Sequence, residues 1–266
     1  MPTFATPQPI AVSVEVAGAR VRVAASDRSD TVVRVEPLDT TSRKDLKVAE
    51  NTEVGFADGR LSVKTTVSGH RRGSVAITIE LPAGSSVDAG LAHSTVHVNG
   101  PLGAGELNLA SGQVQLESVS SLKANIGGDA TIDGAAFAMR IGEAKGAVGL
   151  SNSGGEVWIG HAAAGVEFES AACDLGIGHA DGDITARSAS GAIRVGRMSH
   201  GRARLTTGSG DIEVGVAEGT AAAVDASSER GAVHNYLSAP ADPAADAAKV
   251  AVSARTRDGD ITIQRG

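Results

Sequence analysis

The chain has 266 residues, of which 41% are hydrophobic and 21% are charged, a composition typical of a globular protein rather than a disordered one. Its formal net charge of −7 at pH 7 argues against binding to nucleic acids or to anionic membranes. The single cysteine excludes an intramolecular disulfide and any metal site that needs several cysteines.

Residues 1–18 carry neither a basic region nor an apolar core of the kind found in secretory signals. No run in the chain approaches the roughly 20 apolar residues that a membrane-spanning helix needs. We therefore expect a cytoplasmic protein without a membrane partner.

Residues 1–90 show the two-residue alternation of apolar and polar side chains that is typical of β-strands. Polar turns such as residues 57–59 separate the alternating runs. This pattern predicts an N-terminal antiparallel β section over about residues 1–90. Its expected strands cover residues 10–16, 20–23, 32–35, 48–56, 61–67 and 75–81.

From about residue 94 the sequence changes to a short repeat, in which pairs of apolar residues recur every nine positions. Turn formers such as Gly154-Gly155 and Ser190-Gly191 lie between the pairs, and the step lengthens by one residue before Ala203. The clearest pairs are Val148/Leu150, Val157/Ile159, Val166/Phe168, Leu175/Ile177, Ile184/Ala186 and Ile193/Val195.

Nine residues are too few to close a coil around a core, so the better unit is eighteen residues with two strands. Ile159-Gly160-His161 and Ile177-Gly178-His179 align at this step. The repeat predicts an all-β fold, a parallel β-solenoid of about 18 residues per coil over residues 91–266, continuous with the N-terminal section. A plain antiparallel meander is the alternative. Residues 238–249, rich in Ala, Pro and Asp, are expected to form a loop or short helix that interrupts the last coils.

A Ser/Asp-Gly-[Asp/Ala]-Ile-x-[Val/Ile] pattern occurs three times, at residues 190–195, 209–214 and 258–263. A further motif, Ile-Thr-Ile-Glu-Leu-Pro-Ala-Gly, occupies residues 77–84. From about residue 75 onward the chain thereby resembles a bacterial β-strand-repeat family of unknown function, often labelled "putative adhesin". The resemblance implies a β-repeat fold, and surface adhesion for some members. A looser likeness in repeat style is to the bactofilins, cytoskeletal β-solenoids that polymerise end to end.

The eighteen-residue step also predicts a column of outward side chains, Glu143, His161, His179 and Arg197, stacked roughly 4.8 Å apart. Two imidazoles with a carboxylate can hold a divalent metal, and the arginine with the histidines can hold an anion. The alternative is an exposed ladder with opposite charges at its ends. We favour the ladder and expect neither a metal nor a cofactor.

Trp158 lies between the inward positions Val157 and Ile159, so its indole should point outward. Its neighbours at the eighteen-residue step are Arg140 and Gly176. The ring is expected either to cover bare glycine backbone or to anchor a ligand or a second subunit.

No nucleophile-elbow, HExxH, P-loop or dinucleotide-binding motif is present. Aspartates such as Asp181, in an Asp-Gly-Asp turn, do not recur as a calcium-binding β-roll requires. The sequence therefore favours a non-enzymatic scaffold or interaction protein, able to self-associate through an exposed solenoid end, with a protein partner or a homo-oligomer. The alternative is a β-solenoid lyase or isomerase on a carbohydrate or natural product that uses the column from Glu143 to Arg197. A deep polar groove beside the column would favour the enzyme.

Overall fold

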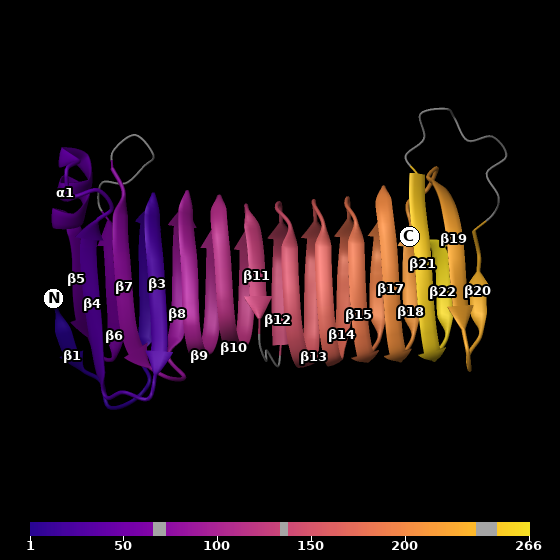
Figure 1. Ribbon diagram of the computed structural model, residues 1–266, viewed down its shortest axis with the longest axis horizontal. Coiled ribbons are helices and arrows are strands. Elements are labelled where there is room, and N and C mark those ends of the chain that lie inside the picture. The colour runs from indigo at the N-terminus through magenta and orange to yellow at the C-terminus, as the bar shows by residue number, and fades with distance from the viewer. Residues whose placement is uncertain (66–72, 134–137, 238–248) are drawn as a thin grey trace. The chain divides into compact units, whose positions relative to one another are not determined.

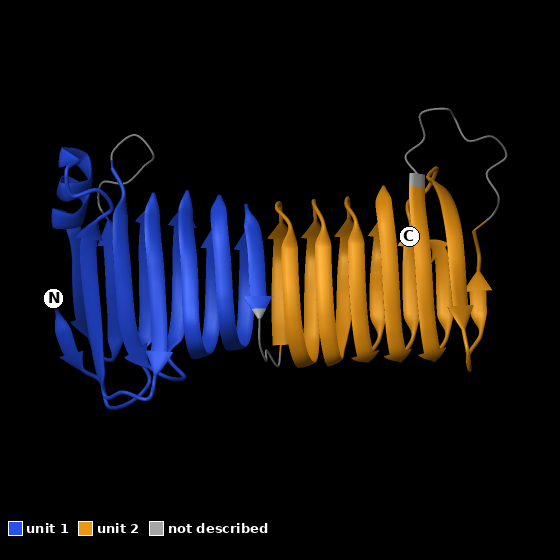
Figure 2. Ribbon diagram, viewed as in Figure 1, with its two compact units in different colours: residues 1–134 blue, residues 135–266 orange. Residues whose placement is uncertain are grey.

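The computed structural model describes residues 1–65, 73–133, 138–237 and 249–266. These residues form 22 strands and a single eight-residue helix, so the predicted all-β class is confirmed. No helix among them is long and apolar enough to cross a bilayer. The chain divides into two compact units, Met1–Gly134 and Ala135–Gly266 (Figure 2), and each is described by itself.

Unit 1 contains the helix and the first half of the strands (Figure 1). In chain order its elements are β1 (Thr3–Ala5), β2 (Ala11–Ala17), β3 (Ala19–Ser26), β4 (Asp30–Pro37), α1 (Arg43–Glu50), β5 (Thr52–Ala57), β6 (Arg60–Thr65), β7 (Val75–Pro82), β8 (Ser86–Ala92), β9 (Ser94–Leu109), β10 (Gly112–Ile126) and β11 (Asp129–Asp133).

The antiparallel section predicted for residues 1–90 is present only in part. Strand β4 is antiparallel to β1 and β7, and β5 is antiparallel to β6. Strand β2, however, pairs in parallel with β6 and β8, and β3 pairs in parallel with β7 and β9. The bend at Gly18, whose φ of 67° suits glycine, is therefore a corner of a coil rather than a hairpin turn. The prediction erred because alternation shows which face of a strand is buried, not the direction of its neighbour.

The parallel coils of unit 1 continue through β8, β9, β10 and β11. Val96 lies opposite Val114, and Val114 lies opposite Ala130, so the coil length varies here between eighteen and sixteen residues. The boundary predicted near residue 90 falls inside β8, which pairs with β2 and with β9.

Aromatic packing joins β1 to β5 within unit 1. The rings of Phe4 and Phe56 stack with their centroids 4.9 Å apart. Residues 43–50, part of which we expected as strand, form α1 because the Ser42 side chain accepts a hydrogen bond from the backbone N–H of Asp45 and caps the helix. Val48 is the buried residue of this helix.

Unit 2 carries the regular repeat. Its strands are β12 (Ala138–Ala144), β13 (Val148–Ala162), β14 (Val166–Ala180), β15 (Ile184–Ser190), β16 (Ile193–Met198), β17 (Gly201–Ser209), β18 (Ile212–Val216), β19 (Ala221–Ser228), β20 (Val233–Asn235), β21 (Lys249–Asp258) and β22 (Ile261–Arg265).

The parallel solenoid and its register are confirmed in unit 2, and the antiparallel meander is excluded. Val148, Val166 and Ile184 lie opposite one another in β13, β14 and β15, one coil of eighteen residues apart. The step lengthens to nineteen where Ile184 meets Ala203. The predicted inward residues at 148, 157, 166, 175, 184 and 193 are each at most 2% exposed.

The last coils of unit 2 do not follow chain order. Strand β21 pairs with β17 on one edge and with β19 on the other, and β22 pairs in the same way with β18 and β20. The final strands of the chain are thus inserted ahead of β19 and β20 (Figure 1). The inserted strands carry Val250, Val252 and Ile261, all at most 2% exposed, whereas β19 is rich in alanine. The expected loop or short helix lies, up to residue 248, outside the described residues.

Candidate functional site: a histidine–carboxylate cluster on unit 2

The register of unit 2 places the four predicted column residues next to one another. Glu143 of β12 lies opposite His161 of β13, His161 opposite His179 of β14, and His179 opposite Arg197 of β16. The eighteen-residue step thus predicts the register neighbours of this column correctly, and a role of the column in binding a ligand or a partner stays a prediction.

A glycine precedes each column residue, and the backbone of the adjacent coil explains why. A Cβ added to Gly160 would lie 2.5 Å from the carbonyl oxygen of Gly142, and one added to Gly178 would lie 2.6 Å from that of Gly160. The strand pairing also skips these glycines, because the chain turns a corner there. The repeated [Ile/Val]-Gly-X motif thus buries the apolar residue, admits the neighbouring backbone and turns X toward solvent.

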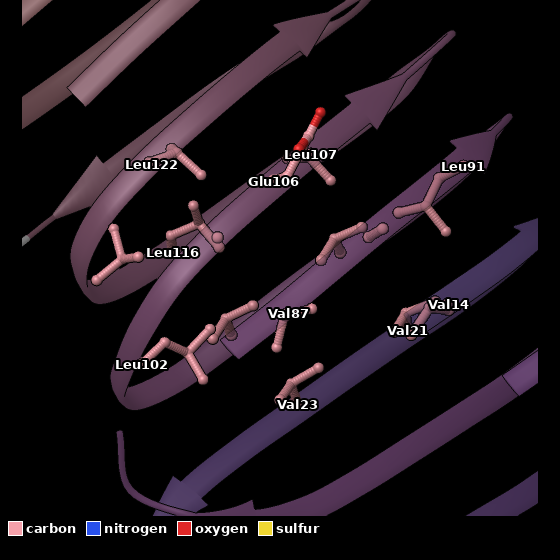
Figure 3. A pocket seen from close by; sticks show the side chains of 15 residues that line it. Val14, Val21, Val23, Val87, Leu91, Leu102, Glu106, Leu107, Leu116 and Leu122 are labelled. Atoms are coloured by element: carbon pink, nitrogen blue, oxygen red, sulfur yellow. The ribbon is translucent and has the colours of Figure 1, made fainter. Parts of the chain in front are cut away.

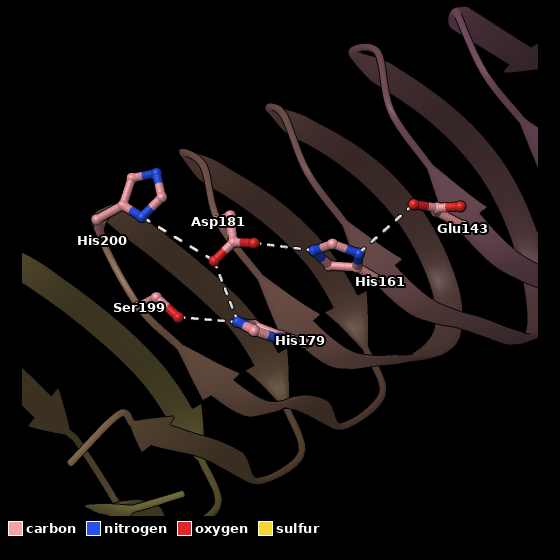
Figure 4. Close-up of polar contacts among 6 residues, drawn as sticks. All are labelled: Glu143, His161, His179, Asp181, Ser199 and His200. Atoms are coloured by element: carbon pink, nitrogen blue, oxygen red, sulfur yellow. Dashed lines mark hydrogen bonds and ion pairs between the residues drawn. The ribbon is translucent and has the colours of Figure 1, made fainter.

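The two histidines converge on a carboxylate that our interpretation of the column did not include (Figure 4). Nε2 of His161 lies 2.9 Å from Oδ2 of Asp181, and Nε2 of His179 lies 3.1 Å from Oδ1 of the same side chain. An ionised carboxylate can only accept, so His161 donates to Asp181 from Nε2, whereas Nε2 of His179 is hydrogen-bonded to the Ser199 hydroxyl. The two rings are 5.1 Å apart between centroids and tilted by 35°.

Hydrogen bonding sets the protonation of Asp181. The hydrogen bond from His161 is the largest cause that holds the pKa of the Asp181 carboxyl below its usual value, and the Ser199 hydroxyl and the charges of His179 and His161 act in the same direction. Partial desolvation opposes them. Asp181 is therefore ionised at neutral pH and available as a ligand or an acceptor.

Further polar groups surround this cluster. Oε1 of Glu143 lies 3.9 Å from Nδ1 of His161, and Nδ1 of His200 lies 4.0 Å from Oδ1 of Asp181. Oγ of Ser199 lies 2.8 Å from Nε2 of His179. The side chains of His161, His179 and Asp181 are 36%, 38% and 29% exposed, so the cluster is open to solvent. Arg197, at the other end of the column, is exposed.

Asp181 and Ser199 were missed because the column was followed at the eighteen-residue step alone. The contacts from His161 to Asp181 and from His179 to Ser199 both span twenty residues, which is one coil plus two positions. Asp181 and Ser199 therefore form a second column beside the histidines. A search at both offsets would have identified them from the sequence.

Trp158 points outward, as predicted, and is 38% exposed. It lies opposite Arg140 and Gly176. A Cβ on Gly176 would lie 2.3 Å from Cε3 of the indole, and one on Gly178 would lie 3.5 Å from Cζ2. The ring therefore covers glycine backbone on the coil next to its own. A role as an anchor for a ligand or a subunit stays a prediction.

A cavity inside unit 1 is too small to be an alternative site. Its volume is about 30 Å³, and side chains such as Val21, Leu107 and Leu116 point into it (Figure 3). Small-molecule sites usually measure about 300–1,000 Å³. The cavity is a gap in core packing, and the cluster around Asp181 is the better candidate.

Comparison with known proteins yields a family and distant structures. The Toastrack DUF4097 family matches residues 10–264. None of the curated proteins compared with the chain matches it. A crystal structure described as a putative adhesin from Parabacteroides merdae is 11% identical, covers 100% of this chain and 95% of its own, and has a TM-score of 0.43. One described as a putative adhesin from Parabacteroides distasonis is 13% identical, with coverages of 100% and 95% and a TM-score of 0.39. A putative lipid binding protein from the same species is 11% identical, with coverages of 100% and 96% and a TM-score of 0.37.

Proposed function

The chain belongs to the Toastrack DUF4097 family, and from that premise we propose that it is a non-enzymatic β-solenoid scaffold that self-associates through the last coil of unit 2. The observation that carries the proposal is the state of β19 and β20. Within the described residues, β19 pairs with β21 alone and β20 pairs with β22 alone. Each strand therefore offers a second edge of N–H and C=O groups to an incoming strand.

The interior of this last coil is also partly open. Ala222 and Val224 lie opposite Val250 and Val252, which are 1% and 2% exposed, yet both side chains of β19 remain half-exposed. Val233 lies opposite the buried Ile261 but is 42% exposed. Apolar side chains at inward positions that still meet water favour the addition of a further coil.

The lyase or isomerase alternative requires a pocket that holds substrate beside the column and excludes water from it. His161, His179 and Asp181 instead lie on an open part of the surface, each about one-third exposed. Their exposure supports a surface that meets a partner.

Sedimentation velocity of the chain over a concentration series tests the proposal. We expect reversible association of the wild type, and a dissociation constant about tenfold larger or more for the double variant Val224→Lys, Val233→Lys, because each lysine places a charge at the open end of the core. The control Ala223→Lys adds one lysine to an exposed position on β19 and is compared with the single variant Val224→Lys on the same strand as well as with the double variant.

Circular dichroism should first verify that all variants retain the β-rich spectrum of the wild type. A wild type that stays monomeric at every concentration contradicts the proposal. So does an equal effect of Ala223→Lys and of the double variant, since the inward face of the coil would then be irrelevant.

A further inference from the structure

Three potential metal ligands meet on the surface of unit 2, and the scaffold function does not require them. His161, His179 and Asp181 each offer one ligand atom, and these atoms all lie within 4.8 Å of one another. They come from two consecutive coils, His161 from β13, and His179 with Asp181 from the end of β14 and the turn after it. A single small ion can therefore reach all three.

We propose that His161, His179 and Asp181 bind one divalent transition-metal ion, with Zn²⁺ as the best fit. Two imidazole nitrogens and one carboxylate oxygen form a donor set that suits zinc and its neighbours in the first transition row. Ca²⁺ and Mg²⁺ prefer sites made of oxygen ligands alone, so the two imidazoles disfavour both ions.

Each Nε2 lies about as far from one oxygen of Asp181 as two ligands of a zinc ion lie from each other, while the three ligand atoms as a set lie within 4.8 Å of one another. Zinc bonds of about 2.0–2.1 Å in a tetrahedron place the ligand atoms about 3.3 Å apart. The two Nε2 atoms already lie 2.9 and 3.1 Å from the oxygens of Asp181. Small side-chain rotations can bring both Nε2 atoms and one Asp181 oxygen around a shared ion. Each Nε2 must then carry no proton, so a neutral imidazole moves its proton to Nδ1 and an imidazolium releases one proton to solvent.

The surroundings also match a metal site. When Nε2 of His161 binds a metal, the proton of that ring moves to Nδ1, which faces Oε1 of Glu143 at 3.9 Å. A carboxylate that accepts a hydrogen bond from a ligating histidine orients the ring and raises its basicity, and Glu143 can do so after a small approach to Nδ1. Oγ of Ser199 lies 2.8 Å from Nε2 of His179, where it can hydrogen-bond to a water bound to the ion.

The backbone holds the two histidines in place before any ion arrives. Opposed positions in paired strands fix their separation, and the glycines at 160 and 178 fix the corner from which both side chains project. Partial exposure gives the ion a path from solvent. A bound ion would link two coils through their side chains, and its remaining coordination positions would face outward.

Isothermal titration calorimetry with ZnCl₂ on the full chain, without a histidine tag and after removal of metals by chelator, tests the site. We expect one Zn²⁺ per chain for the wild type. His161→Gln, His179→Gln and Asp181→Asn should each weaken binding about tenfold or more, because each removes a ligand. The control His97→Gln makes the same substitution on β9 of unit 1 and should leave binding unchanged.

Co²⁺ provides a second readout that does not depend on any variant. Bound to the wild type, it should give visible d–d absorption without a thiolate charge-transfer band, because Cys173 is buried and lies outside the proposed ligands. Saturable binding that the three ligand variants leave unchanged overturns the proposal, since the ion must then bind elsewhere. Absence of saturable Zn²⁺ binding to the wild type overturns it as well.

Discussion

In the regular coils of unit 2 the same position before the column is a glycine, and its replacement tests whether the close approach of neighbouring coils requires it. These glycines are Gly142, Gly160, Gly178, Gly196 and Gly215. Gly215→Ala on β18 adds a single methyl group where the preceding coil, at β16, leaves no room. The new Cβ would lie 1.8 Å from the carbonyl oxygen of Gly196, whereas an ordinary contact begins near 3.4 Å. At Gly196 the corresponding distance, to the carbonyl oxygen of Gly178, is 2.8 Å.

These distances set the expected costs. Gly196→Ala needs a shift of several tenths of an ångström and should destabilise unit 2 by about 1 kcal/mol. Gly215→Ala needs a shift of more than an ångström between paired backbones and should cost about 3 kcal/mol. The control is Gly165→Ala in the same unit, where the nearest heavy atom, the carbonyl oxygen of Asp183, is 3.6 Å away. Its effect should stay within about 0.5 kcal/mol.

Denaturant unfolding followed by tryptophan fluorescence measures these differences in the correct unit. Trp158 is the single tryptophan of the chain and lies in unit 2, so its emission reports the unfolding of that unit. We expect the midpoint to fall in the order Gly165→Ala, Gly196→Ala, Gly215→Ala. If Gly215→Ala unfolds at the same denaturant concentration as Gly165→Ala, close approach of the coils is not what requires these glycines.

Three further predictions concern single side chains of unit 2. Ile177→Asp, at a position 0% exposed, should lower the free energy of unfolding by about 4 kcal/mol in the same assay. Arg194→Asp, whose side chain is 52% exposed, should lower it by about 1 kcal/mol or less. Equal losses of stability would contradict the assigned inward and outward faces. The pKa of Asp181 is lowered in the folded chain, so the wild type should be more stable than Asp181→Asn above about pH 4. This advantage should disappear as the pH falls through the folded pKa of Asp181. An advantage that grows in acid would contradict the lowered pKa. Burial, the largest cause, raises the pKa of the Cys173 thiol, so a thiol reagent should label it about a hundredfold more slowly in the native than in the unfolded chain, and rapid native labelling would place it at the surface.

Much of unit 2 could be predicted because its repeat is regular. In a parallel solenoid a constant step in sequence becomes a constant neighbour in space, so the inward position of Ile177, the outward position of Trp158 and the pairing of His161 with His179 all follow from counting residues. The same repeat shows that glycines recur before each column residue, but it does not show why glycine is required there. That reason is a contact with the carbonyl of another coil, which the sequence of one coil does not contain.

The chemistry of the candidate site was predicted only in part. Two histidines on one column imply a shared environment, and their register bears this out. The carboxylate that joins them comes from the turn that follows His179, because the turn bends back toward the preceding coil and brings Asp181 within 2.9 Å of His161. The path of a turn depends on packing against its neighbours, so side chains there are harder to place than those of a strand.

The sequence by itself determined the fold class, the direction of each strand's apolar face and the length of the regular coil, because these depend on local alternation and on a fixed step along the chain. Tertiary structure alone decided which strands become neighbours where the step varies. Strands β2 and β3 join parallel coils although their alternation fits a hairpin equally well. Strands β21 and β22 lie between β17 and β18 on one side and β19 and β20 on the other. In this position their valines and isoleucines are fully buried, and the alanine-rich β19, which exposes less apolar surface to water, forms the last coil instead. Burial of the whole coil, rather than order along the chain, makes that choice.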